Sequence, residues 1–153
     1  MTVTWRSAVL YALTVVVLSW LTGAAVDLAW QATSGGLDVW LSFWLKDPWN
    51  AVFLAATTAV LTLARRLDTP LPRWRVILVD GGLYLAAFLA SWGACAWAAD
   101  GAPADGAFFM AYFALFTLQL PAAWLLSAWR SGHLQVVLKD DEADSANRDR
   151  TCQ

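Results

Sequence analysis

The chain has few of the residues that enzymes and metalloproteins use for chemistry. Its 153 residues include one histidine, His133, and two cysteines, Cys95 and Cys152. A haem buried in a membrane needs an imidazole ligand within an apolar run, whereas His133 lies in a polar stretch. One cysteine lies in an apolar run and the other in a polar tail, so the two cannot form a disulfide framework. Gly-rich phosphate loops, Ser/His/Asp sets and metal-ligand spacings are missing as well. The sequence therefore predicts no catalytic, cofactor or metal site, and a protein that is not an enzyme.

Charge is also scarce. Only 14% of the residues are charged, and ten Lys and Arg against twelve Asp and Glu leave a net charge of −2. Such a balance excludes a nucleic-acid-binding protein, which needs a basic surface. Soluble domains contain about 25% charged and about 45–50% apolar residues. Here 59% of the residues are hydrophobic and the mean hydropathy is +0.52. These values predict an integral membrane protein whose first partner is the lipid bilayer.

Long apolar runs predict four transmembrane helices. A hydrocarbon core about 30 Å thick needs about 17–25 helical residues. Runs of this kind cover about residues 8–30, 48–64, 76–99 and 106–129. The predicted fold is therefore all-α: a polytopic four-helix transmembrane domain over residues 1–138, followed by a polar cytoplasmic tail over residues 139–153. The first run is longer than the apolar part of a signal peptide, so we expect it to remain as a membrane anchor.

The basic residues predict the orientation of these spans. If the chain crosses the membrane four times, nine of its ten Lys and Arg residues fall on the same side: Arg6, Arg65, Arg66, Arg73, Arg75, Arg130, Lys139, Arg148 and Arg150. Only Lys46 falls on the other side. Because cytoplasmic loops carry the excess of Lys and Arg, both termini are expected to be cytoplasmic, in a bacterial inner (plasma) membrane. The loops at residues 31–47 and 100–105 then face outward.

The first outer loop predicts a short amphipathic helix at about residues 37–46, lying in the membrane interface. Its apolar residues recur at the spacing of one helix face: Leu37, Trp40, Leu41, Trp44 and Leu45. Asp47 and Pro48 then supply an N-cap and a first helical residue for the second span. Two interpretations are open. Leu37, Trp40, Leu41 and Trp44 are either a docking surface for a partner or part of a lid over the helix ends, since indole rings favour the interface in any case.

The eleven tryptophans fall mostly near the ends of the predicted spans. Amphipathic rings at both headgroup layers form such aromatic belts. Only Trp20, Trp92 and Trp124 lie deeper in the apolar runs.

The third span carries a row of small residues at every fourth position: Gly82, Ala86, Ala90, Ala94 and Ala98. We call these five residues the small row. Small residues at this spacing allow another helix to approach closely. The second span has a similar row, Ala51, Ala55 and Ala59, and the two spans are expected to be antiparallel neighbours. We expect the two rows to pack against each other, with the bulky Phe88 facing away. The alternative is a face for self-association or for another membrane protein.

Three polar residues inside the spans are the candidate functional residues. Asp80 lies about one turn inside the third span, near the arginines of the cytoplasmic loop. Its expected role is a structural ion pair at the interface, and the alternative is a proton- or cation-responsive carboxylate at the mouth of a pathway. Thr117 and Gln119 precede Pro121, which removes one backbone hydrogen bond and predicts a kink near Thr117.

These observations favour a non-enzymatic small membrane subunit that packs against a larger membrane protein complex and stabilises or regulates it. The layout of four spans with an interfacial helix after the first resembles the small membrane subunit of tripartite periplasmic-binding-protein transporters. That resemblance is one of architecture and assigns no residues. A small homo-oligomeric transporter or pore, with Asp80 and Gln119 on its pathway, is one alternative. A membrane-embedded immunity-type protein is the other.

Overall fold

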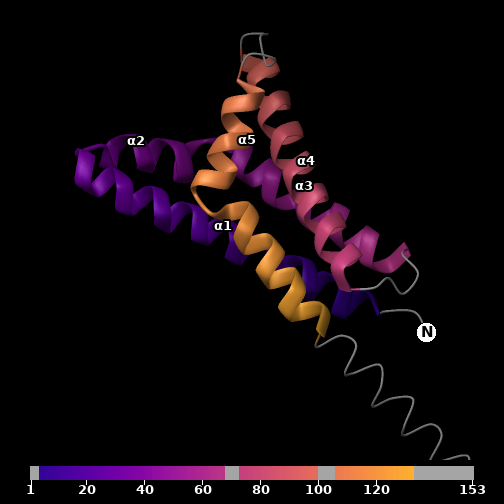
Figure 1. Ribbon diagram of the computed structural model, residues 1–153. Coiled ribbons are helices and arrows are strands. Elements are labelled where there is room, and N and C mark those ends of the chain that lie inside the picture. Colours follow the sequence, from indigo (N-terminus) through magenta and orange to yellow (C-terminus); the bar gives the residue numbers. More distant parts are fainter. Residues whose placement is uncertain (1–3, 68–72, 100–105, 133–153) are drawn as a thin grey trace, which may run out of the picture.

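The computed structural model describes residues 4–67, 73–99 and 106–132. Nearly all of them are helical and none is in a strand, which confirms the all-α prediction. The elements in chain order are α1 (Trp5–Ser34), α2 (Leu37–Leu41), the π-helix η1 (Ser42–Lys46), α3 (Pro48–Leu67), α4 (Arg73–Ala99), α5 (Ala107–Phe116) and a further helix, Gln119–Gly132 (Figure 1). We call the last of these helix 119–132. The predicted tail at 139–153, His133, Cys152 and the loop at 100–105 lie outside the described residues.

Local chemistry explains where the helices begin and end. The Thr4 hydroxyl accepts a hydrogen bond from the Ser7 amide and caps the start of α1. Gly35 ends α1 in the left-handed conformation with φ of 79°, which glycine adopts without a steric penalty. The Asp47 carboxylate accepts from the Trp49 amide at 3.1 Å, and Pro48 is the first residue of α3. The predicted helix start at Asp47 and Pro48 is therefore confirmed.

Two helices are long and apolar enough to cross a membrane, namely α1 and the segment Trp74–Ala98 of α4. A third span results if α5 and helix 119–132, which are bent by 57° relative to each other, count as one. By the same criterion α3 does not qualify, because it begins with Pro48, Trp49 and Asn50 and ends with Arg65 and Arg66. Helix length and composition thus support an integral membrane protein with two or three spans, not the predicted four.

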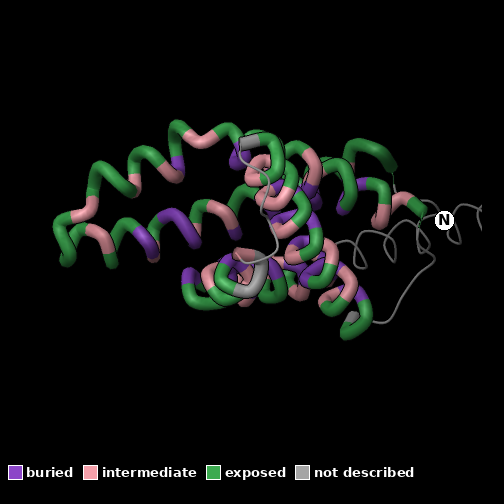
Figure 2. The backbone as a smooth tube through the Cα atoms, turned by 90° about the horizontal axis from the view of Figure 1, so that it is seen from above, coloured by how far each residue is buried: buried purple, intermediate pink, exposed green. Residues whose placement is uncertain are grey.

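The helices α1, α3 and α4 form the main packing unit, with α3 in contact with both of the others. The segments α2 and η1 turn back along the distal half of α1, and α5 lies against α4 (Figure 1). The start of α1, the end of α3, the start of α4 and the end of helix 119–132 lie toward one end of the molecule, whereas the far ends of α1 and α4 diverge. Figure 2 shows that buried positions gather where the helices face one another.

Aromatic side chains fill the centre of the bundle. Phe53 of α3 packs edge-to-face on Tyr84 and Phe88 of α4, with ring centroids 5.2 and 5.3 Å apart. Phe88 also packs edge-to-face on Trp49, at 5.0 Å. Since lipid is as apolar as these side chains, such close packing, and not a hydrophobic gain, holds helices together inside a bilayer.

The orientation of α4 differs from the prediction. Every member of the small row, Gly82, Ala86, Ala90, Ala94 and Ala98, is exposed. Among the described residues, no other segment comes within 4 Å of a Cβ added at Gly82. Phe88, which was expected to face away from the packing surface, is completely buried. The residues Ala51, Ala55 and Ala59 of α3 are exposed as well. The expectation that the two rows pack together is therefore wrong, because α3 and α4 meet through aromatic side chains.

The predicted kink near Thr117 is confirmed. The chain leaves the helical conformation at Thr117 and Leu118, and Leu118 has a φ of 60°. Pro121 lies in the first turn of helix 119–132, where a backbone amide has no partner within the helix. The break places Thr117 and Gln119 at the centre of the bend.

Candidate functional site

Three side chains, each from a different helix, meet at Asp80 of α4. Arg65, in the last turn of α3, donates from Nη2 to Asp80 Oδ1 at 2.7 Å. The hydroxyl of Ser127, from helix 119–132, donates to Asp80 Oδ2 at 2.5 Å. The phenol of Tyr11, from α1, donates to the same oxygen. We call Asp80, Arg65, Tyr11 and Ser127 the Asp80 network.

The Asp80 network is shielded from solvent. Asp80 is 0% exposed and the Arg65 side chain is 9% exposed. The Arg65 guanidinium also lies 5.9 Å from the centre of the Tyr11 ring. Its Nε atom is buried and has no hydrogen-bond partner within the described part of the chain. A buried charge is tolerated only when it is paired and hydrogen-bonded, so the network holds α1, α3, α4 and helix 119–132 in one arrangement.

The sequence identified Asp80 but not its surroundings. The expected ion pair is formed with Arg65, and both side chains are buried inside the bundle. Tyr11 and Ser127 were not identified as site residues. The only sequence signal for these two residues was that each places a hydroxyl near the predicted cytoplasmic end of an apolar run. Asp80 lies at a similar distance from the predicted cytoplasmic end of its own span.

Thr117 and Gln119 form a second buried polar cluster, separate from the Asp80 network. Tyr84 donates from its phenol to Gln119 Oε1 at 3.1 Å, and Gln119 donates from Nε2 to the Thr117 hydroxyl, also at 3.1 Å. Gly23 of α1 lies directly against Gln119, because a Cβ at Gly23 would overlap the amide side chain. The break before helix 119–132 thus turns Gln119 into the bundle, where its hydrogen bonds link α4 to the bend.

The tryptophans of the predicted docking surface face the chain itself. Trp44 is 1% exposed and donates from Nε1 to Asp27 Oδ2 at 2.7 Å. Trp40 donates from Nε1 to the Ala24 carbonyl at 2.9 Å. Leu37 and Leu41 remain exposed. Trp44 is therefore not accessible to a partner, and the indole bonds attach α2 and η1 to α1 as a lid.

Asn50, which sequence reasoning did not single out, fixes the lid to α3. Its Nδ2 atom donates to the Phe43 carbonyl at 2.7 Å, and its Oδ1 atom accepts from Trp20 Nε1 at 3.0 Å. Trp20 was predicted to lie deep in the first span, and this bond satisfies its indole nitrogen. The Phe43 and Trp44 carbonyls belong to the π-helix η1. Its wider turn explains why the residues that face inward do not follow the α-helical spacing predicted from the sequence.

The chemistry available at these clusters is hydrogen bonding and charge pairing. Asp80 accepts three hydrogen bonds, one of them from a cation, so its oxygens are already engaged. Among the described residues, no group of three or more His, Cys, Asp or Glu is placed to hold a metal ion. Comparison of the chain with protein-family models, with curated proteins and with solved structures finds no match.

Proposed function

We propose that this chain is a non-enzymatic small membrane subunit that packs against a larger membrane protein and stabilises or regulates it. One observation carries the proposal: α4 turns its small row, Gly82 to Ala98, outward along the whole span. The opposite face of α4 is already filled by Tyr84 and Phe88. Small residues allow a neighbouring transmembrane helix to approach closely, and within the described part of the chain this face has no such neighbour at Gly82.

The proposal includes four transmembrane spans with both termini in the cytoplasm of a bacterial cell. We count α3 as a span because it packs between α1 and α4 and ends with Arg65 and Arg66 at the level where α1 begins. Nine of the ten basic residues then lie on the cytoplasmic side, as the positive-inside rule requires. Protease accessibility of tags placed at each terminus and in the loop at residues 31–47 tests this topology.

The internal polar clusters support a subunit role indirectly. The Asp80 network and the cluster around Gln119 point into the bundle and join helices of the same chain. These bonds stabilise one arrangement of the helices, so the subunit presents a fixed apolar surface to its partner.

The test is affinity purification in mild detergent, with mass spectrometry of the proteins that co-elute. Ala90→Leu enlarges the centre of the small row, and overpacking of about 1–3 kcal/mol corresponds to at least a fivefold loss of the partner. Because Ala90 is exposed, we expect the melting temperature of the isolated Ala90→Leu variant to stay at the wild-type value. Val52→Leu, at an exposed position of α3, is the matched control and should keep the partner. An intact complex with Ala90→Leu would contradict the assignment of this face.

A transporter or pore is the second candidate, and the buried polar groups favour it. Besides Asp80 and Gln119, the hydroxyls of Ser19 and Thr57 are buried without a hydrogen-bond partner in the described part of the chain. Unpaired buried hydroxyls are candidate positions for water. A homogeneous homo-oligomer that conducts solute in liposomes, and loses this flux with Asp80→Asn at normal insertion, would support this candidate against the subunit.

A further inference from the structure

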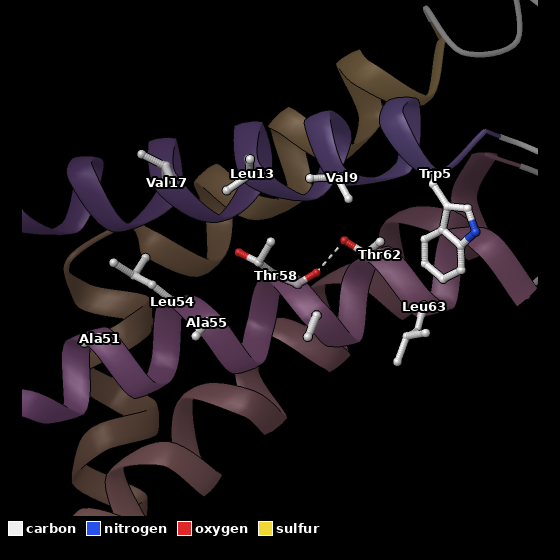
Figure 3. Close-up of a pocket in the computed structure, with 11 residues that line it drawn as sticks. Trp5, Val9, Leu13, Val17, Ala51, Leu54, Ala55, Thr58, Thr62 and Leu63 are labelled. Atoms are coloured by element: carbon white, nitrogen blue, oxygen red, sulfur yellow. Dashed lines mark hydrogen bonds between the residues drawn. The ribbon is translucent and has the colours of Figure 1, made fainter.

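An apolar groove runs along the outer surface between α1 and α3 (Figure 3). Its volume is about 770 Å³. Val9, Leu13 and Val17 of α1 form one wall, and α3 contributes a floor of small residues that includes Ala55 and Ala59. The Thr62 hydroxyl at the groove donates to the Thr58 carbonyl at 2.6 Å, so it is satisfied within α3. Apart from these two threonines the lining is apolar, so the groove suits an occupant that is mostly apolar along its length.

The length of the groove matches one leaflet of a bilayer. Its lining along α1 extends from Trp5 to Val17, which at about 1.5 Å per helical residue is about 18 Å. One leaflet of a hydrocarbon core about 30 Å thick measures about 15 Å. An occupant that enters beside Trp5 would thus reach Val17 of α1, near the middle of the bilayer.

Positive charge is concentrated at the Trp5 end. The guanidinium of Arg66 stacks on the Trp5 ring, with its Cζ atom 4.8 Å from the ring centre. Arg6, the neighbour of Trp5, is exposed. None of the residues that line the groove is itself charged, so Arg66 reaches this end through its contact with Trp5, and the opposite end is lined by Ala51, Leu54 and Val17. Basic residues at the interface beside a gap between transmembrane helices are typical of sites for anionic lipid headgroups.

We propose that this groove binds an anionic phospholipid, with one acyl chain between α1 and α3 and the phosphate beside Arg66 and Arg6. The proposal rests on α3 lying in the bilayer, as proposed above, and not on the identity of a protein partner. A second copy of the chain is the competing occupant. The charged end distinguishes the two, since a helix of a second copy would bring its own arginines against Arg6 and Arg66.

The test uses the full chain, purified in a neutral detergent, with phosphatidylglycerol and phosphatidylcholine of the same acyl chains as probes. Native mass spectrometry counts bound lipid, and melting temperature reports stabilisation. We expect about a tenfold preference for phosphatidylglycerol. Ala55→Phe should fill the groove and reduce binding of both lipids, whereas Ala29→Phe, at an exposed alanine of α1 outside the groove, should change neither. The double variant Arg6→Gln, Arg66→Gln should remove the preference and keep the basal binding of phosphatidylcholine.

Three results would overturn the inference. Equal binding of the two lipids would mean that bulk lipid merely covers the groove. Wild-type lipid binding by Ala55→Phe would place the lipid elsewhere. A wild-type dimer that Ala55→Phe converts to a monomer would identify a second copy as the occupant. None of these results depends on whether a protein co-purifies with the chain, so the subunit proposal is tested separately.

Discussion

Asp80→Asn is the substitution that tests the structure most directly. It removes the negative charge with little change of shape and leaves the Arg65 guanidinium, which is 9% exposed, without a counter-charge. The new amide also presents donor hydrogens where Tyr11 and Ser127 now donate to Asp80 Oδ2. Removing one member of a buried ion pair costs about 3–5 kcal/mol. An exposed interfacial pair, as the sequence suggested, would cost about 1 kcal/mol or less.

A double-mutant cycle separates the ion pair from the hydroxyl donors. Arg65→Met should cost about 3 kcal/mol, because the carboxylate keeps its bonds from Tyr11 and Ser127. The double variant Asp80→Asn, Arg65→Met removes both charges, so its cost should be smaller than the sum by at least about 2 kcal/mol. Tyr11→Phe keeps the pair and loses one charge-assisted hydrogen bond, at about 1.5 kcal/mol.

The measurement is the free energy of unfolding from titration with dodecyl sulfate in mixed micelles, followed by circular dichroism. Asp38→Asn, an exposed carboxylate of α2, is the control and should stay within about 0.5 kcal/mol of wild type. An Asp80→Asn protein within 1 kcal/mol of wild type would refute the buried network. Strict additivity in the cycle would refute the pairing of Asp80 with Arg65.

Three further comparisons use neighbouring residues and the same unfolding measurement. Gly81→Ala should destabilise the protein by about 1–3 kcal/mol, because the new Cβ would overlap the Trp124 indole. Gly82→Ala places its Cβ in open space and should stabilise the protein by about 0.5–1 kcal/mol. The same sign for both changes would be evidence against this orientation of α4. Trp44→Ser should cost about 3 kcal/mol or more, because it leaves a buried cavity and removes the hydrogen bond to Asp27. Leu45→Ser, at an exposed position, should cost under about 0.5 kcal/mol. Equal costs would mean that the lid does not pack on α1. Phe88→Ala should cost about 3–5 kcal/mol and Ala90→Leu almost nothing, and the reverse order would restore the prediction that the small row packs inside the chain.

The helices themselves were predictable because their signals are local. Apolar runs of spanning length, the Asp47 and Pro48 start of α3 and the Pro121 break each depend on residues that are close in sequence. The number of spans was less predictable, since α3 mixes an apolar centre with polar ends. Its assignment depends on the neighbours that hold it and not on its own composition.

The rotation of α4 could not be predicted from its composition. The helix is apolar on nearly every side, so no polar face identifies the surface that packs inward. Gly81 and Gly82 are adjacent and chemically identical, yet one lies against Trp124 and the other faces outward. Small residues and aromatic residues can both form an interface, and here the aromatic rings of Phe53, Tyr84 and Phe88 form it.

The partners of Asp80 were equally hidden, because they are remote in sequence. Tyr11 lies 69 residues before Asp80 and Ser127 lies 47 residues after it. Several arginines were near enough to be candidates, among them Arg75, which stacks on Trp74 instead. Only the packing of α3 against α4 places Arg65 beside the carboxylate.

The spacing of the Asp80 network along the chain has a consequence for biogenesis. Arg65 and Asp80 are 15 residues apart, on the consecutive helices α3 and α4, so both charges emerge from the ribosome within one helical hairpin. A charge that is buried in the protein without a counter-charge is costly, and a partner on the neighbouring helix removes much of that cost. In the four-span topology proposed above, α3 and α4 insert as one hairpin, and the carboxylate and the guanidinium can pair before Ser127 has been synthesised. On that topology we expect helix 119–132 to dock after the hairpin and to add the Ser127 hydroxyl to a pair that has already formed.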